Sequence, residues 1–293
     1  MTTDVPEPAS PDPVRAWIAT AMGAPVISMT RLVGGTHADT YDVRTGPPAR
    51  NSVLRRYPVG DDAALRERRV LAALDGLDGL CPRLIAGDED GTVTGSPTTL
   101  ISRLRGEAAI PSDNTAGWAR QLGRALARIH ASRPKKPLPL VRNKSGGQPR
   151  AVSGPGRDIV LDRWDDLYAA PEVLTHHDFW SGNVVAEAET ITGVVDWNGA
   201  CLGPPSFDLG WCRLDLVLLY DEAAADVMTT AYADALDMQT PDPWLADVWA
   251  TARSHADVHT WASNYIPLGR TDLTPDTLRR RHDDWTSRLL ART

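Results

Sequence analysis

The pattern of the sequence changes along the chain, from β-rich runs in the first third to long helical stripes in the last. Apolar and β-branched runs flank turn signals between residues 28 and 59, whereas residues from about 208 onward carry apolar residues at helical spacing. Strands grouped ahead of helices are typical of an α+β architecture. A chain of 293 residues accommodates two compact lobes. We therefore expect a two-lobed α+β chain, with a small antiparallel-sheet N-terminal lobe over residues 1–104 and a mostly helical C-terminal lobe over residues 105–293.

Local signals predict the elements within each lobe. A proline in the first turn and a glycine just past the end predict a short helix over residues 13–22. Three antiparallel strands are expected between residues 28 and 59, where turn signals break the β-rich stretch. Helical spacing in DDAALRERRVLAALDGL and WARQLGRALARIH predicts two longer helices, and the apolar run SPTTLISRLRG predicts a further strand. Two short β-runs, NVVAE and ITGVVDW, are expected to pair as a hairpin.

Composition argues against several classes of function. A net charge of -7 and a pI near 5.5 argue against a nucleic-acid partner, because phosphate backbones bind basic surfaces. No apolar run approaches the roughly 20 residues that span a bilayer, and the opening segment MTTDVPEPASPDPV lacks the features of a secretory signal. We therefore expect a cytoplasmic protein without a membrane partner. Cys81, Cys201 and Cys212 suit neither a disulfide framework nor paired zinc ligands, so we expect buried thiols.

The segment HHDFWSGN, residues 176–183, carries side chains suited to phosphoryl transfer. This chemistry needs a carboxylate at the acceptor hydroxyl, oxygen ligands for magnesium and a cation for the phosphates. Asp178 and Asn183 stand five positions apart ahead of the run NVVAE, and Asp196 follows the apolar run ITGVV thirteen residues later. If the two runs pair, Asp196 emerges beside Asn183. The spacing matches the kinase pattern HxDxxxxN followed by a metal-binding aspartate.

These motifs resemble the aminoglycoside phosphotransferase family, also called the phosphotransferase enzyme family of kinase-like small-molecule kinases. HHDFWSGN, VVDW and PPSFDLG follow the family signature. The resemblance implies that Asp178 is the catalytic carboxylate and that Asn183 and Asp196 are ligands of Mg²⁺. It further implies that Asp208 braces the catalytic loop and that His176 orients it. His177 stands where the family usually has glycine.

The resemblance extends to the expected nucleotide-binding lobe. RLVGGTHADTYDV is similar to the family's nucleotide loop, with Gly34 and Gly35 near the phosphates, and LRERRVLAAL is similar to the helix whose acid, here Glu67, pairs with a strand cation. That cation is expected to be Arg55, because all three lysines, Lys135, Lys136 and Lys144, lie in one central loop. Arg55 is a forked donor that could bridge the phosphates and the acid. The backbone from Ser102 to Leu104 would then meet the base of ATP or GTP.

Two other interpretations explain these residues less well. His176, His177 and Asp178 could form a transition-metal hydrolase site, but adjacent histidines on an extended segment point to opposite faces, so a hydrogen-bonded core role for His176 fits better. Turn chemistry alone explains each Asp or Asn singly. It does not explain their combination with PPSFDLG, Arg55 and Glu67.

The acceptor stays open at this point. Antibiotics, amino alcohols and sugars are all compatible with the pattern. A peptide acceptor is not expected, because PPSFDLG follows Asp196 too closely to leave room for the activation segment of a protein kinase. Acids past Asp208 either line a pocket for an aminated substrate or form a solvated helix face, and the solvated face is expected; these acids include Asp215, Glu222, Asp226 and Asp257. A nucleotide-binding sensor without catalysis is the alternative from a different class.

Overall fold

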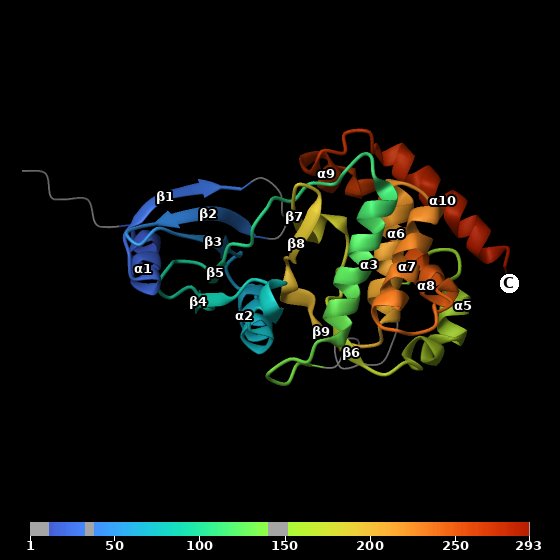
Figure 1. Ribbon diagram of the computed structural model, residues 1–293, viewed down its shortest axis with the longest axis horizontal. Coiled ribbons are helices and arrows are strands. Elements are labelled where there is room, and N and C mark those ends of the chain that lie inside the picture. The colour runs from blue at the N-terminus through green and yellow to red at the C-terminus, as the bar shows by residue number, and fades with distance from the viewer. Residues whose placement is uncertain (1–11, 33–37, 140–151, 293) are drawn as a thin grey trace, which may run out of the picture. The chain divides into compact units, whose positions relative to one another are not determined.

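The computed structural model describes residues 12–32, 38–139 and 152–292 (Figure 1). The chain forms two compact units, Met1–Arg68 with Leu84–Arg103, and Arg69–Arg83 with Leu104–Thr293. An antiparallel sheet dominates the first unit and helices dominate the second. The predicted α+β class with a sheet-based and a helical part is confirmed.

The first unit is built on a five-stranded antiparallel sheet in the order β1-β2-β3-β5-β4. The expected strands and helices form, and Leu54 pairs with Tyr41 on one side and Leu100 on the other. The elements of this part are α1 (Pro13–Met22), β1 (Val26–Arg31), β2 (Asp39–Thr45), β3 (Arg50–Arg56), α2 (Ala63–Leu74), β4 (Leu84–Asp88) and β5 (Thr98–Ser102). Helix α2 crosses from the first unit into the second at residue 69.

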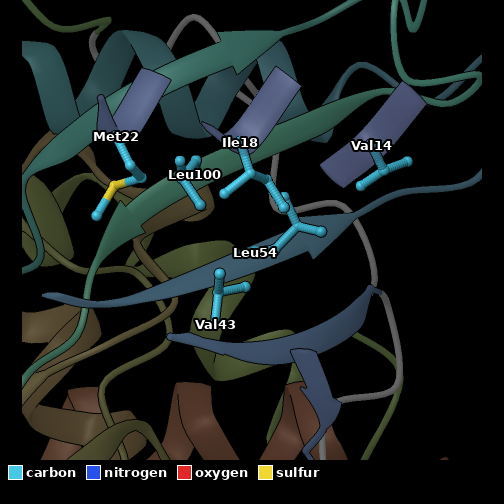
Figure 2. Packing of buried hydrophobic residues seen from close by; sticks show 6 residues of the cluster. All are labelled: Val14, Ile18, Met22, Val43, Leu54 and Leu100. Atoms are coloured by element: carbon cyan, nitrogen blue, oxygen red, sulfur yellow. The ribbon is translucent and has the colours of Figure 1, made fainter. Parts of the chain in front are cut away.

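Helix α1 covers the sheet with its apolar side (Figure 2). The side chain of Asp12 caps the helix by accepting a hydrogen bond from the Val14 amide, and Gly23 ends it with a φ of 65° that glycine adopts without strain. The core cluster joins side chains of α1 to side chains of the sheet: Val14, Ile18, Met22, Val43, Leu54 and Leu100. The proline and glycine signals in the sequence thus give the helix the bounds that were predicted.

The second unit contains two small two-stranded sheets and the long helices. Its elements are α3 (Thr115–Ala131), α5 (Arg157–Asp162), β6 (Val173–Thr175), β7 (Val184–Glu187), β8 (Thr190–Val194), β9 (Cys201–Gly203), α6 (Ser206–Leu219), α7 (Glu222–Ala235), α8 (Trp244–Ser254), α9 (Ala262–Tyr265) and α10 (Pro275–Leu290). Strand β6 pairs with β9, and β7 pairs with β8. These two small sheets carry the segments that hold the candidate catalytic residues.

The helices of the second unit pack around α6, which is buried along most of its length. Helix α7 packs against both α3 and α6, and α8 also packs against α6 (Figure 1). Cys81, Cys201 and Cys212 are buried free thiols, as expected. None of the described helices combines the length and the apolar character needed to cross a membrane.

Candidate active site

The β7–β8 hairpin brings the candidate metal ligands together. Val184 pairs with Val194, and the Val195 amide donates a hydrogen bond to the Asn183 carbonyl oxygen at 2.8 Å. The hairpin expected from the sequence is therefore present. Asp196 is the next residue after Val195, so it lies close to Asn183 on the paired strand. Asp196 has a φ of 63°, and the Asn198 side-chain amide donates to its Oδ1 at 3.0 Å. The left-handed backbone at Asp196 turns the chain sharply at the end of the strand.

Asp178 is held by hydrogen bonds to both of its carboxylate oxygens. Nδ2 of Asn183 donates to Oδ2 of Asp178 at 3.0 Å and to its carbonyl oxygen at 2.9 Å, while Nε1 of Trp211 donates to Oδ1 at 3.0 Å. Burial raises the pKa of Asp178, and the charge of Asp196 raises it too, although His176 and the hydrogen bonds from Trp211 and Asn183 act in the opposite direction. The carboxylate is thus fixed in place and more basic than an ordinary aspartate.

Asp208 fastens the start of the loop over residues 176–183, which carries Asp178. Its Oδ2 accepts a hydrogen bond from the His176 amide and its Oδ1 accepts one from the His177 amide, each at 2.7 Å. The carboxylate is fully buried, and Nε2 of His130 lies 3.2 Å from Oδ2. Burial alone would raise the pKa of Asp208, but the hydrogen bond with His130 and the charges of His130, His176 and His177 together lower it. The geometry is that of a brace for the loop.

The two histidines of the loop differ in their surroundings. His176 is fully buried, its Nε2 lies 2.9 Å from the Val195 carbonyl oxygen, and its ring meets Trp197 edge-on at 4.6 Å. It therefore connects the loop to the strand end that carries Asp196. His177 has a φ of 68°, the left-handed region that favours glycine. The histidine thus keeps a backbone conformation suited to the glycine of the family signature.

Asp215 fastens the end of the same loop, which corrects the expectation of a solvated helix face. Its Oδ2 accepts a hydrogen bond from the Ser181 amide at 3.0 Å, and its Oδ1 accepts one from the Tyr265 hydroxyl at 2.9 Å. The side chain is buried, and burial raises its pKa to about 6. Asp208 and Asp215 lie seven residues apart on α6, so both project from one side of that helix.

In the first unit, Arg55 of β3 forms a buried ion pair with Glu67 of α2. The Tyr57 hydroxyl donates to Oε2 of Glu67 at 2.8 Å, and the Thr99 hydroxyl donates to the same oxygen. Glu67 is 1% exposed, so its carboxylate depends on these partners and not on water. The strand arginine and the helix acid suggested by the resemblance therefore meet.

The other residues expected to contact the nucleotide are Gly34, Gly35, Ser102 and Leu104. Gly34 and Gly35 lie outside the described residues. Ser102 ends β5 and pairs with Ser52 of β3, whereas Leu104 is the residue at which the chain enters the second unit again. The backbone that was expected to meet the base thus lies where the chain passes from the first unit to the second.

Replacing Arg55 with methionine is expected to lower the free energy of unfolding by about 3 to 5 kcal/mol, because it leaves the buried Glu67 carboxylate without its counter-charge. Urea denaturation of the wild type and the variant measures the difference. Arg44→Met, at an exposed position on the neighbouring strand β2, is the matched control and should change the free energy by no more than about 0.5 kcal/mol. Equal losses in the two variants would show that the ion pair contributes nothing specific.

The sequence matches the model of the Phosphotransferase enzyme family over residues 28–244. The chain belongs to this family. It is accordingly a phosphotransferase enzyme. The family resemblance drawn from HHDFWSGN, VVDW and PPSFDLG is confirmed. No curated protein gives a significant match to the chain.

Several solved structures share the fold. A Ralstonia eutropha JMP134 protein assigned to the aminoglycoside phosphotransferases has a TM-score of 0.61 at 18% identity, covering 94% of this chain and 98% of its own. The macrolide 2'-phosphotransferase MphH from Brachybacterium faecium has a TM-score of 0.57 at 20% identity, covering 92% and 97%. A thermostable aminoglycoside phosphotransferase APH(4)-Ia, solved with ADP and hygromycin B, has a TM-score of 0.58 at 16% identity, covering 92% and 98%.

Three contributors to the site were missed by sequence reasoning. Trp211 bonds to Asp178, Asp215 holds Ser181, and His130 of α3 supports Asp208 while its Nδ1 lies 2.8 Å from the Tyr232 hydroxyl. A signal for Asp215 was present, because an acid inside the apolar run LDLVLL predicts a buried carboxylate with partners. No local signal indicated His130, whose partner is 78 residues away in the chain.

Proposed function

We propose that this enzyme transfers the γ-phosphoryl group of a nucleoside triphosphate to a hydroxyl of a small molecule in the presence of Mg²⁺. The observation that carries the proposal is the immobilised carboxylate of Asp178. Asn183 and Trp211 bond to it, and the two acids of α6 fasten its loop at both ends. A carboxylate held in this way is suited to receive and align an acceptor hydroxyl.

The residues beside Asp178 fit a magnesium ion. Asn183 uses its Nδ2 to bond Asp178, which turns its amide oxygen, the atom a metal ion requires, away from that carboxylate. Asp196 supplies a carboxylate from the adjoining strand end. Mg²⁺ prefers such oxygen ligands, so we propose Asn183 and Asp196 as its protein ligands. When bound, the ion would neutralise charge on the phosphates of the donor.

Asp178 is proposed as the catalytic residue. Burial raises its pKa, so its carboxylate accepts a proton from the acceptor hydroxyl more readily than an exposed aspartate would. Its two hydrogen bonds restrict rotation and keep one orientation toward the acceptor. His176 and Asp208 are proposed to keep the loop in position without touching the reacting atoms, since both are fully buried.

The donor is proposed to be ATP or GTP. APH(4)-Ia structures contain ADP or AMP-PNP, which supports a nucleotide donor for the related fold. We propose that Arg55, oriented by Glu67, contacts the phosphates together with the Gly34-Gly35 segment, and that the backbone from Ser102 to Leu104 meets the base. A nucleoside triphosphate donor also suits a cytoplasmic enzyme, which is our proposal for its location.

A panel assay tests the proposed activity. Nucleotide consumption with Mg²⁺ is measured across aminoglycosides, macrolides, choline-like amines and sugars, and the products are identified by mass spectrometry. The proposal expects consumption that depends on the acceptor and yields a product heavier by one phosphoryl group. Tight nucleotide binding with no acceptor-dependent consumption in any class would favour the sensor alternative.

The surface beside Asp178 suggests which acceptors react best. The guanidinium of Arg253 lies 5.7 Å from the ring centroid of Trp211 and 5.9 Å from that of Trp249. Trp211 in turn lies edge-on to Trp261 at 5.4 Å and bonds to Asp178. Desolvation lowers the pKa of Arg253 and the charge of Asp178 opposes this shift, so the two charges act on each other. We propose that aromatic rings and this cation contact the acceptor, which disfavours polycations.

Arg253→Glu is expected to raise kcat/KM for cationic acceptors relative to neutral ones by at least about tenfold, because it replaces repulsion of a cation by attraction. The ratio is measured for the cationic and neutral acceptors that the panel identifies. Arg280→Glu makes the same charge change at an exposed position on α10 and should leave the ratio unchanged. The same ratio in wild type and Arg253→Glu would contradict the assignment of Arg253 to the acceptor surface.

A further inference from the structure

His282 on α10 has a proton position that its neighbours determine. The residue is fully buried, and its Nε2 lies 3.1 Å from the Thr251 carbonyl oxygen and 3.0 Å from the Ser254 hydroxyl oxygen, both on α8. A carbonyl oxygen can only accept a hydrogen bond, so Nε2 must carry the proton. In the neutral ring, Nδ1 therefore carries no proton and has a free lone pair.

That lone pair faces a second acceptor. Oδ1 of Asp283 lies 3.4 Å from Nδ1 of His282, and the Thr286 hydroxyl lies 3.5 Å away but donates its proton to the His282 carbonyl oxygen at 2.8 Å. Two electron-pair donors thus face each other with no proton between them, an arrangement that a cation would stabilise.

His255, just past the end of α8, supplies a third donor. Its ring centroid lies 5.7 Å from that of His282, and one donor atom from each of His255, His282 and Asp283 lies within 4.8 Å of the others. Nδ1 of His255 is buried, and it has no hydrogen-bond partner in the described part of the chain. An imidazole with an unsatisfied nitrogen is available to bind a ligand.

We propose that His255, His282 and Asp283 form a binding site for a divalent transition-metal ion such as Zn²⁺, separate from the magnesium ligands. Two imidazoles, one carboxylate and a solvent molecule make a tetrahedral zinc set, whose donor atoms lie about 3.3 to 3.5 Å apart for bonds near 2.1 Å. The His282–Asp283 separation of 3.4 Å already fits that geometry. His255 would move inward.

Groups around the three proposed ligands affect how well a metal ion would bind. The bond from Nε2 of His282 to the Thr251 carbonyl is the kind of outer contact that orients a metal-binding imidazole. The Asp283 side chain is 51% exposed and gives the ion a path from solvent. Arg279, 3.7 Å from Asp283 and in contact with His259, is the cation that a metal ion must compete with. A bound ion would link the end of α8 to α10.

Zinc titration of the nucleotide-free wild-type enzyme tests the site by calorimetry, with Co²⁺ absorption as a second readout of tetrahedral coordination. The expected result is one equivalent of Zn²⁺ per chain and visible-region Co²⁺ bands. His255→Ala and Asp283→Asn should each weaken zinc binding by about 100-fold or more, since even outer contacts of a metal site are worth 10 to 100-fold.

His259→Ala, which removes an exposed histidine close by, and Asp196→Asn, which alters the proposed magnesium site, are the controls and should bind zinc as the wild type does. Circular dichroism checks that each variant is folded. The proposal is overturned if the wild type shows no saturable zinc binding, or if His255→Ala binds with wild-type affinity. Because binding is measured without nucleotide or acceptor, the result is independent of the proposed transfer activity.

Discussion

Asp178→Asn is expected to lower kcat by about 10² to 10⁴, because the amide cannot accept the proton of the acceptor hydroxyl. Affinity for the Mg²⁺–nucleotide complex should stay within about threefold of the wild type, since the proposed ligands Asn183 and Asp196 are retained. Asparagine also preserves the shape of the side chain and can still accept the hydrogen bond from Trp211. The loss should therefore be confined to transfer.

Steady-state kinetics with the best acceptor of the panel and nucleotide binding by calorimetry measure the two effects separately. Asp158→Asn, at a side chain that is 89% exposed, makes the same chemical change away from the site and should leave both quantities unaltered. Retention of more than about a tenth of the wild-type kcat by Asp178→Asn would remove Asp178 from the catalytic role, because a positioned proton acceptor contributes at least about 100-fold.

Asp208→Ala is expected to lower the free energy of unfolding by about 3 to 5 kcal/mol, the range found when one partner of a buried charged network is removed. The substitution removes the acceptor of three groups, the backbone amides of His176 and His177 and the ring of His130. Water cannot replace it, because position 208 is fully buried. Unpaired buried donors retain their full desolvation cost. Transfer activity should fall as well, because the loop that carries Asp178 loses its anchor.

Chemical denaturation measures the loss, with Asp158→Ala as the exposed control. If Asp208→Ala does not fold, Asp208→Asn keeps one acceptor oxygen and gives a smaller loss that can be measured. A change below about 1 kcal/mol in Asp208→Asn and full activity would show that the loop does not depend on this carboxylate, since a single hydrogen bond to a charged group is worth about 1.5 to 3 kcal/mol.

The elements with strong local signals could be predicted from the sequence. Proline and glycine gave the bounds of α1, and β-runs around a short turn predicted the β7–β8 hairpin, which places Asp196 beside Asn183. These predictions succeeded because turn and capping chemistry acts over a few residues. The candidate ligands could be named because HHDFWSGN and VVDW follow the signature of the family that the chain resembles.

Residues whose roles depend on tertiary packing could not be predicted in this way. The bond of His130 to Asp208 depends on how α3 packs beside the segments of the site, and spacing within either segment does not report it. Asp215 was assigned to a solvated face because acids on helices are usually exposed, yet its helix is buried on nearly all sides. Strands β6 and β9 have three residues each, too few to show an alternating pattern.

The coupling between magnesium and nucleotide binding tests the central claim most directly. Calorimetric titration with AMP-PNP, with and without Mg²⁺, compares the wild type with Asp196→Ala. If Asn183 and Asp196 hold the ion on the nucleotide, Mg²⁺ should tighten binding at least about tenfold in the wild type, a coupling of about 1.4 kcal/mol, and should have no such effect in Asp196→Ala. The same enhancement by Mg²⁺ in both proteins would contradict the account.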